Sequence, residues 1–215
     1  RQMCIRDRPY LSNGLLNAIV AKWSAESKLD TSENIINNYI LPEASKFQEF
    51  AKSDKLDANM YHMFAAFCDE QLRSGEIESV ISAYDKTARQ KKKDLMDLDK
   101  FMRDESKPRH DRKDAHRVFK RLEIQYKAEI LELKKHLKYR EKCTHNAVDF
   151  YLKSLVLGDD HDATDTDRFC ALWLENSDHI VIDSELLMSI SSHKFIQWAS
   201  QLISRLFNEN TKFQD

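Results

Sequence analysis

The chain has 215 residues, enough for one sizeable domain or one stretch of a repeat array. Its 34 basic and 36 acidic side chains nearly cancel, so the overall charge does not call for a polyanionic partner. Three glycines and three prolines are too few for the tight turns of an all-β fold or the glycine-rich turn of a dinucleotide-binding α/β fold. The composition therefore predicts an all-α protein of long helices with few breaks.

Residues 1–8 differ in character from the rest of the chain. The string RQMCIRDR follows neither a helical nor a strand period and lacks the apolar run of a secretion signal. We interpret residues 1–8 as translated adapter or cloning sequence, and residues 9–215 as the structured part. No apolar run in the chain approaches the roughly 20 residues of a membrane-spanning helix, so we expect no contact with a membrane.

The first predicted helix covers about residues 10–27. Asp30, which precedes Thr31 and is followed three residues later by Glu33, is typical of a helix start. The second predicted helix contains Pro42, which removes a backbone donor, so we expect a kink or break near Ile40–Leu41. The apolar side chains of the first helix recur at helical spacing on one face: Leu15, Leu16, Ile19, Val20 and Trp23.

Two long helices follow a third helix that covers about residues 57–74. Gly75 is placed to end the third helix, and the fourth runs from Glu76 to about Met102. Pro108 marks the sharpest break, after which the longest predicted helix covers about residues 111–157. We therefore predict an antiparallel helical hairpin over about residues 76–157. The predicted seam of its second helix consists of Val118, Leu122, Tyr126, Ile130, Leu133 and Leu137.

The C-terminal part is predicted to contain further amphipathic helices. Gly158 ends the long helix, and we expect Asp162 or Thr164 to cap the next one. The β-branched residues 180–182 could form a strand, but it would have no partner. The helix lengths suit a degenerate α-solenoid of antiparallel helix pairs. The last predicted helix shows the spacing i, i+3, i+4, i+7: Phe195, Trp198, Ala199, Leu202, Ile203 and Leu206.

No residue is assigned a catalytic, cofactor-binding or metal-binding role. Residues 159–162, Asp-Asp-His-Asp, are consecutive, whereas calcium loops space their ligands at alternate positions, so we predict capping and solvation there. His136 and His145 lie among charged residues and are predicted to be solvated, and His193 is predicted to cap or pack. The sequence holds no H-E-x-x-H, Gly-x-Ser-x-Gly, Asp-Phe-Gly or glycine-rich phosphate-loop motif. The four cysteines are scattered and are predicted to be reduced, in a reducing compartment: Cys4, Cys68, Cys143 and Cys170. The last three lie within apolar helical patterns.

The tip of the predicted hairpin is basic. Seven basic residues from Lys107 to Arg121 stand against two acidic ones, Asp111 and Asp114, and Lys91–Lys93 lie on the opposing helix. Phosphate contacts from such a surface would depend on salt. Because aromatic residues for base stacking are few and no recognition-helix motif occurs, we interpret the tip as a solvated helical end and expect no direct DNA contact.

The final third of the sequence resembles the FAT region of the ATM (ataxia-telangiectasia mutated) kinase family. Residues 169–177, FCALWLENS, look like the family's hydrophobic-C-x-L-W-L-E-N-S stretch. Residues 147–162 are similar to its AVxxYxxxLxxGxxHD passage, and residues 193–205 to its YKFLPLxYQLxxR helix. A weaker likeness extends over nearly everything after residue 20. The chain departs from the family pattern in three places: His193 replaces an aromatic residue, Gln197 and Trp198 replace Pro-Leu, and the acidic segment 163–167 replaces an apolar Met-Trp.

The resemblance implies a FAT-type α-solenoid over residues 9–215 that supports the kinase domain of a phosphatidylinositol-3-kinase-related Ser/Thr protein kinase. Such a kinase phosphorylates Ser or Thr before Gln in the nuclear DNA-damage response. Its kinase domain, with ATP and Mg, would lie outside these residues. The implied partners are that kinase domain, neighbouring helical repeats and a second copy of the whole protein. Trp173 and Leu174 are expected to be buried against adjacent helices.

Two alternatives stay open at this point. The first is the FAT region of another kinase of the same superfamily, acting in replication stress or nutrient sensing. The second is a free-standing helical-repeat adaptor that binds protein or nucleic acid. An adaptor should have polar capping helices, so the strongly apolar face of the last helix favours the kinase scaffold.

Overall fold

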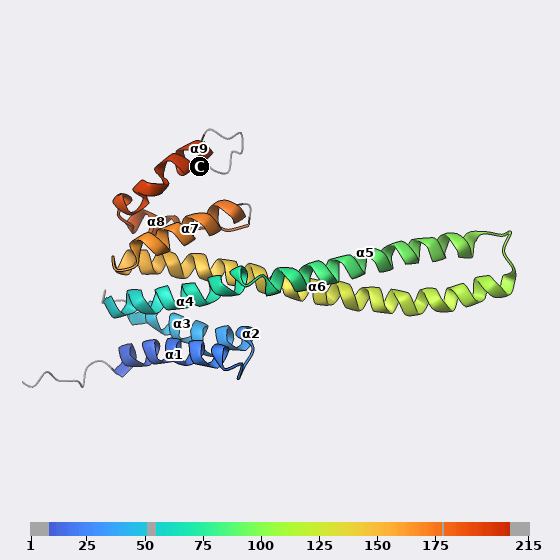
Figure 1. Cartoon of the computed structure of the whole chain (residues 1–215), viewed down its shortest axis with the longest axis horizontal. Coiled ribbons are helices and arrows are strands. Elements are labelled where there is room, and N and C mark those ends of the chain that lie inside the picture. Colours follow the sequence, from blue (N-terminus) through green and yellow to red (C-terminus); the bar gives the residue numbers. More distant parts are fainter. Residues whose placement is uncertain (1–8, 51–54, 178, 207–215) are drawn as a thin grey trace, which may run out of the picture. The chain divides into compact units, whose positions relative to one another are not determined.

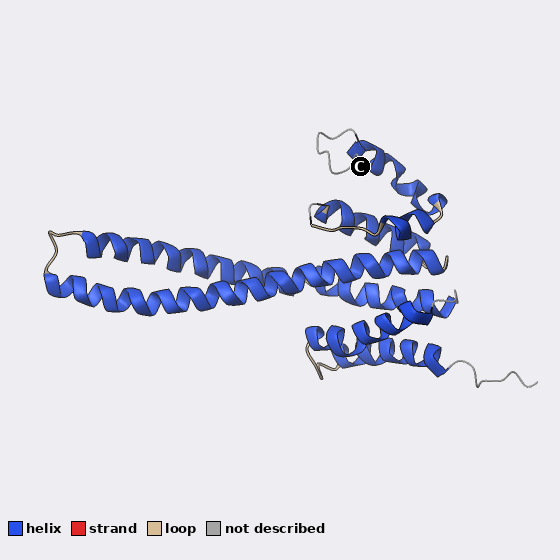
Figure 2. Ribbon diagram, turned by 180° about the vertical axis from the view of Figure 1, so that it is seen from behind, coloured by secondary structure: helices blue, strands red, loops and turns tan. Residues whose placement is uncertain are grey.

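The computed structural model describes residues 9–50, 55–177 and 179–206. Every regular element in these ranges is a helix, and none of them contains a strand (Figure 2). The all-α prediction is confirmed, and residues 180–182 form an irregular connection. Residues 1–8 lie outside the described ranges, so their interpretation as adapter sequence stays a prediction, as does the role given to Cys4.

The chain divides into two compact units, each treated by itself. Unit 1 comprises residues 1–71 and 143–215, and unit 2 comprises residues 72–142. The described helices, labelled in Figure 1, are α1 (Pro9–Glu26), α2 (Ser32–Ile35), the π-helix η2 (Ile36–Ile40), α3 (Leu41–Phe50), α4 (Lys55–Arg73), α5 (Glu76–Arg103), α6 (Arg109–Leu157), α7 (Asp162–Asn176), α8 (Ser184–Ser189), the 3-10 helix η3 (Ser192–Trp198) and α9 (Ala199–Leu206).

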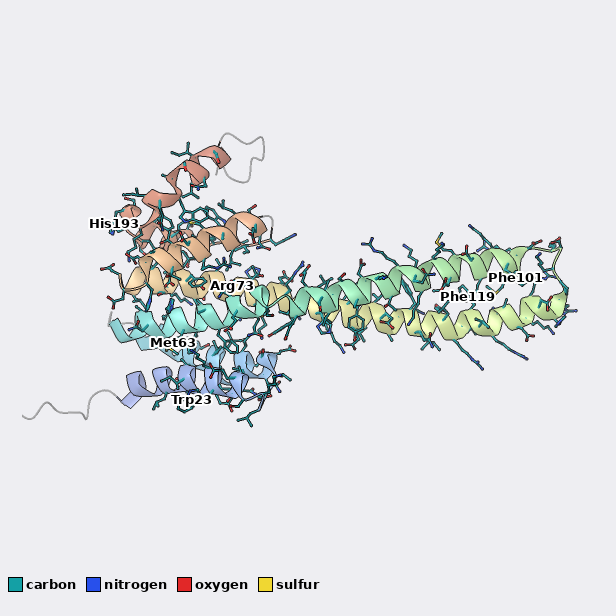
Figure 3. All side chains as sticks on the ribbon, in the orientation of Figure 1. Trp23, Met63, Arg73, Phe101, Phe119 and His193 are labelled. Atoms are coloured by element: carbon teal, nitrogen blue, oxygen red, sulfur yellow. The ribbon has the colours of Figure 1, made fainter. Side chains whose placement is uncertain are left out.

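Helix α1 has the predicted bounds but buries a different face. Ala18 and Ala21 are buried, whereas Leu16, Val20 and Trp23 are exposed by 54%, 37% and 63%. Small alanines let α1 approach η2 closely, so the larger apolar side chains are left on the outer face. Figure 3 shows Trp23 on that outer face. The three exposed side chains follow helical spacing along that outer face, in line with the prediction that they share one face of the helix.

The break before Pro42 takes the form of a π-helix. The N–H of Leu41 donates to the carbonyl of Ile36, five residues back, instead of four. A wider turn accommodates the proline ring and its missing donor. The chain stays helical from Ser32 to Phe50, so the expected kink or break takes the form of a local widening of the helix. The helix start is also where the sequence predicted it, although the cap is Thr31, whose hydroxyl accepts from the Asn34 N–H, and Asp30 supports Thr31.

The core of unit 1 is built from stacked helices. Figure 1 shows α1, α3, α4, the C-terminal part of α6 and α7 in succession. The Phe150 ring of α6 contacts Tyr61 and Phe64 of α4, with ring centroids 6.0 and 5.9 Å apart. Two helical segments distant in sequence are thereby joined, as in the predicted α-solenoid. Three cysteines are buried and free, which confirms their predicted place in the core: Cys68, Cys143 and Cys170.

Two boundaries near the C-terminus differ from the prediction. His161 is the N-cap of α7 and makes no side-chain capping bond, so neither Asp162 nor Thr164 is the cap. The last predicted helix is split into η3 and α9, with Phe195 and Trp198 in the 3-10 part. The structure uses Asp162 and the tight 3-10 turn for a separate contact, described below.

Unit 2 is an antiparallel hairpin of α5 and the first part of α6, as predicted. Glu78 lies opposite Arg140, Tyr84 opposite His136 and Lys91 opposite Glu129. The two antiparallel helices therefore keep nearly the same register along the seam. Phe101 and Phe119 lie near the tip in the same register (Figure 3). The turn between the helices holds Pro108, where the sequence predicted the break.

One side chain of the predicted seam and two histidines differ from the prediction. Val118 is 51% exposed because the register directs its neighbour Phe119 inward. His136 is stacked on Tyr84, with ring centroids 5.5 Å apart, and His145 of unit 1 is half-buried, so neither is simply solvated. A straight α-helix drifts out of step with a strict seven-residue repeat over this length, and the drift determines which side chains face the partner helix.

Candidate functional site: an apolar groove and its anchors

An apolar groove of about 930 Å³ lies along the C-terminal helices of unit 1. Phe169 and Trp173 of α7, whose rings stack with centroids 5.8 Å apart, form one wall. Ile196 is 70% exposed and Met188 is 86% exposed, although both are large apolar side chains. The other wall comes from α8, η3 and α9 and the residues between them: Leu187, Met188, Ile190, Phe195, Ile196, Ala199, Leu202 and Ile203.

The groove changes the interpretation of the FCALWLENS stretch. Leu172 of this stretch is buried, but Trp173 and Leu174 are only half-buried and line the groove. We had expected both to be buried in this chain. A groove of this volume with an exposed apolar lining is typical of a surface against which another apolar element packs.

Lys194 of η3 anchors the wall of the groove to the end of α6. Its ammonium donates to the carbonyls of Leu155 and Gly158, at 2.8 and 2.7 Å. It also forms ion pairs with Asp159 and Asp162, both at 2.8 Å, and its side chain is 4% exposed. A cation at the C-terminal end of a helix satisfies carbonyls that have no partner within the helix.

The charge of Lys194 is retained in this buried position. Burial lowers the pKa of Lys194, but the hydrogen bonds and charges of Asp159 and Asp162 raise it, and the net result is a pKa above the usual 10.5. Two members of the acidic run 159–162 therefore bind a lysine. The sequence had predicted capping and solvation for this run, and could not show a partner more than 30 residues away.

The residues that carry the family resemblance meet at this anchor. Gly158, Asp162 and Lys194 stand in the quoted GxxHD and YKF patterns. Gly158 is close to α4, since a Cβ atom there would lie 2.7 Å from the Cβ of Ala58. The imidazole Nε2 of His161 lies 2.6 Å from the Asn59 Oδ1 of α4. These contacts fix the turn between α6 and α7.

A second anchor joins α7 to the outer end of η3. Asp167 Oδ1 accepts from the Trp198 indole N–H at 2.6 Å and from the Gln197 amide at 3.1 Å. His193, which was predicted to cap or pack, contacts the Ser191 hydroxyl through its Nδ1 at 2.7 Å and is exposed. Asp167, Gln197 and Trp198 all stand where the chain departs from the family pattern.

A buried polar network lies deeper in unit 1. Arg168 of α7 donates to Asp69 of α4 from Nε at 2.7 Å and from an NH2 group at 2.8 Å, and the Tyr151 hydroxyl of α6 donates to Asp69 at 3.2 Å. Burial raises the pKa of Tyr151, and the charge of Asp69 raises it further. The phenol therefore stays a neutral donor, and the network ties three helices together.

Two histidine rings stack beside this network. His62 of α4 and His161 have ring centroids 3.7 Å apart and planes 8° apart. His62 Nδ1 lies 2.6 Å from Asp165 Oδ1, and the Asp165 side chain is 1% exposed. The arrangement gives one oxygen of a buried carboxylate a partner and connects α4 with α7.

In residues 9–50, 55–177 and 179–206, no group of three or more His, Cys, Asp or Glu side chains is placed to hold a metal ion. Burial raises the pKa of the Cys170 thiol to about 12, with a smaller contribution from Asp167, so the thiol is protonated at neutral pH and is a poor nucleophile. The same described ranges hold no helix long and apolar enough to cross a membrane.

The basic tip of unit 2 is partly neutralised by its own acidic residues. Arg117 pairs with Asp114 at 3.1 Å, and His110 lies 2.9 Å from Asp111. Lys91 pairs with Glu129 across the hairpin and its side chain is 19% exposed, so it belongs to the seam. The cationic surface is therefore smaller than the count of basic residues indicates.

Comparison with known proteins places the chain within much longer ones. No family model matches it. The serine/threonine-protein kinase TEL1 of Debaryomyces hansenii is 32% identical over 209 residues, which is 95% of this chain and 7% of that protein. TEL1 of Saccharomyces cerevisiae is 29% identical over 202 residues, 93% of this chain and 7% of that protein. The chain thus spans about 7% of the length of these relatives.

Solved structures agree on the fold. The structure of the FAT and kinase domain of CtTel1 superposes with a TM-score of 0.74, covering 94% of this chain and 13% of that one, at 23% identity. The open conformation of CtTel1 gives a TM-score of 0.73, covering 94% of this chain and 7% of that one, also at 23% identity. Together with the sequence matches along nearly its whole length, these likenesses identify the chain as a FAT-region segment of the Tel1 family of ATM-like serine/threonine-protein kinases.

Proposed function

We propose that this segment is a helical scaffold that supports and regulates the kinase domain of an ATM-like Ser/Thr protein kinase. The kinase domain, which would bind ATP and Mg, lies outside these 215 residues. The segment acts mechanically: it holds neighbouring helices and transmits partner-induced movement through shifts of packed helices.

The observation that carries this proposal is the apolar groove of α7, α8, η3 and α9. It presents aromatic and aliphatic side chains on a surface that a neighbouring helical repeat of the same polypeptide would cover. Each large apolar side chain buried there contributes about 1.5–3 kcal/mol to the free energy of packing. The exposed stripe of Leu16, Val20 and Trp23 on α1 offers a second surface for another repeat.

The test compares two charged substitutions in two contexts. Ile196 lies in the groove and is 70% exposed, and Val181 lies outside it and is 91% exposed. Because both side chains face solvent in this chain, Ile196→Glu and Val181→Glu should both leave the thermal midpoint of the 215-residue chain nearly unchanged. In the whole kinase, Ile196→Glu should lower the thermal midpoint and reduce the rate of peptide phosphorylation at least tenfold, while Val181→Glu should change neither. Equal behaviour of the two variants in the whole kinase would refute the scaffold role of the groove.

We further propose that the whole protein forms a homodimer. The proposal is supported by the solved structure of a complete CtTel1 dimer with C2 symmetry, which has a TM-score of 0.72 to this chain. Mass photometry of the purified whole protein at nanomolar concentration would test it. A single peak at the mass of one polypeptide would contradict the proposal.

The proposed setting is the nucleus, in the DNA-damage response and DNA repair, with Ser or Thr before Gln as the phosphorylated site. It is supported by the family resemblance of residues 147–205. A fluorescently tagged whole protein in its own cells should be nuclear, and its loss should remove damage-induced phosphorylation before Gln. A cytoplasmic protein with unchanged phosphorylation would contradict this setting.

A further inference from the structure

Residues 190–203, here called the strap, form most of one wall of the groove. The strap comprises η3, part of α9 and the residues before them, and its side chains face Phe169 and Trp173. Phe195 meets Phe169 edge-on, with ring centroids 6.1 Å apart. The position of the strap therefore sets the width of the groove.

One end of the strap is held by a charge inside the protein. The Lys194 side chain is 4% exposed, and its ammonium has exchanged water for two helix-terminal carbonyls and two carboxylates. A buried ammonium is tolerated when such partners surround it, and removing it leaves those acceptors without their donor. The contact is also specific in shape, because an ammonium is a compact point charge and the planar guanidinium of arginine is not.

A second point of the strap, the C-terminal end of η3, is held at the surface. Trp198 and Gln197 both donate to Asp167 Oδ1. The family pattern has Pro-Leu in place of these two donors and apolar Met-Trp in place of the acidic segment that contains Asp167. The two departures from the pattern are thus each other's partners in this chain.

We propose that Lys194 is a positioning residue that holds the strap against the turn between α6 and α7, and that Asp167 holds the strap at a second point, the C-terminal end of η3. Releasing Lys194 frees residues 190–203 as a local unit and remodels the groove while the rest of unit 1 stays folded. The core network of Asp69, Arg168 and Tyr151 lies between α4, α6 and α7 and does not involve the strap. The inference rests on the proposed function in one respect: the occupant of the groove that the strap shapes is a neighbouring repeat of the same polypeptide.

Hydrogen exchange measured by mass spectrometry on the 215-residue chain tests the strap directly. In Lys194→Met, amides of residues 190–203 should exchange at least tenfold faster than in the unchanged chain, while those of α4 and α7 should change less than twofold. Glu185→Gln on the neighbouring helix α8 is the control, because it removes an exposed charge without touching the anchor. Unchanged exchange in the strap, or equal acceleration throughout unit 1, would overturn the proposal.

Milder variants keep the test decisive if Lys194→Met does not fold. Asp162→Asn removes one charge from the anchor and should accelerate exchange about threefold along the strap. Asp167→Asn should accelerate amide exchange at residues 197–203 and leave the exchange of residues 190–194 unchanged. If neither variant changes the strap, the proposal fails. These readouts need no kinase domain, so their failure is distinguishable from failure of the scaffold test with Ile196→Glu.

Discussion

Arg168 of α7 holds Asp69 of α4 through two hydrogen bonds, at 2.7 and 2.8 Å, across 99 residues of sequence. Asp69 is fully buried, whereas the Arg168 side chain is 31% exposed. The hydrogen bonds to Asp69 raise the pKa of Arg168, opposing the effect of burial. The contact fixes α7, which forms one wall of the groove, to α4 in the core of unit 1.

Removing this arginine should destabilise unit 1 strongly. Arg168→Met leaves the Asp69 carboxylate buried with Tyr151 as its remaining donor from the network, and we expect a loss of about 3–5 kcal/mol of unfolding free energy, typical of an uncompensated buried charge. Urea denaturation followed by circular dichroism measures it. Arg103→Met removes an exposed arginine that pairs with Asp99 and should leave the midpoint unchanged. Similar midpoints for both variants would show that the network contributes no stability.

Gly158 should not tolerate a methyl group. The added Cβ would lie 2.7 Å from the Ala58 Cβ, so Gly158→Ala should cost about 1–3 kcal/mol through overpacking. Thermal denaturation measures the loss. Ala58→Gly removes the atom that clashes, and the double variant should regain much of the midpoint lost by Gly158→Ala. A double variant less stable than either single variant would show that the clash is not the cause.

Cys170 should make stability fall as pH rises above 9. The thiol has a pKa of about 12 in the folded chain and a usual value of 9.0, so the folded state keeps a proton that the unfolded state loses. This stabilisation is fully present below pH 9 and is lost as the pH rises toward 12. Between pH 9 and 10, stability should fall more steeply than in Cys170→Ala, by about 1 kcal/mol per pH unit. Urea midpoints at several pH values measure the difference, and parallel pH dependence would contradict it.

The hairpin of unit 2 should respond to a charge reversal at its seam. Lys91 and Glu129 are 2.7 Å apart and about one-fifth exposed. Lys91→Glu places two carboxylates together and should cost about 1 kcal/mol or more, since the pair is less screened than a surface pair. The swapped double variant Lys91→Glu, Glu129→Lys should restore stability. Calorimetry of the unchanged chain, the single variant and the double variant tests the register. If the double variant does not recover stability, Lys91 and Glu129 are not in contact.

Much of the candidate site could be recognised in the sequence, but as separate pieces. The motif around Gly158 and the segment containing Lys194 both appeared in the family resemblance, yet their contact joins residues 36 positions apart. The groove was missed because Trp173 and Leu174 follow the same helical pattern as core residues. Its one signal was the apolar face of the last predicted helix. On α1, the spacing placed the large side chains on one face but did not show that Ala18 and Ala21 are the buried ones.

The sequence by itself determined the all-α class, the irregularity before Pro42, the break at Pro108 and the hairpin, because backbone geometry and local periodicity act over a few residues. Tertiary structure decided which face of each helix is buried, which carboxylates receive Lys194 and Arg168, and where apolar side chains stay open to a neighbour. These outcomes depend on the spacing between helices distant in sequence, where the size of an alanine or the reach of a charged side chain selects the contact.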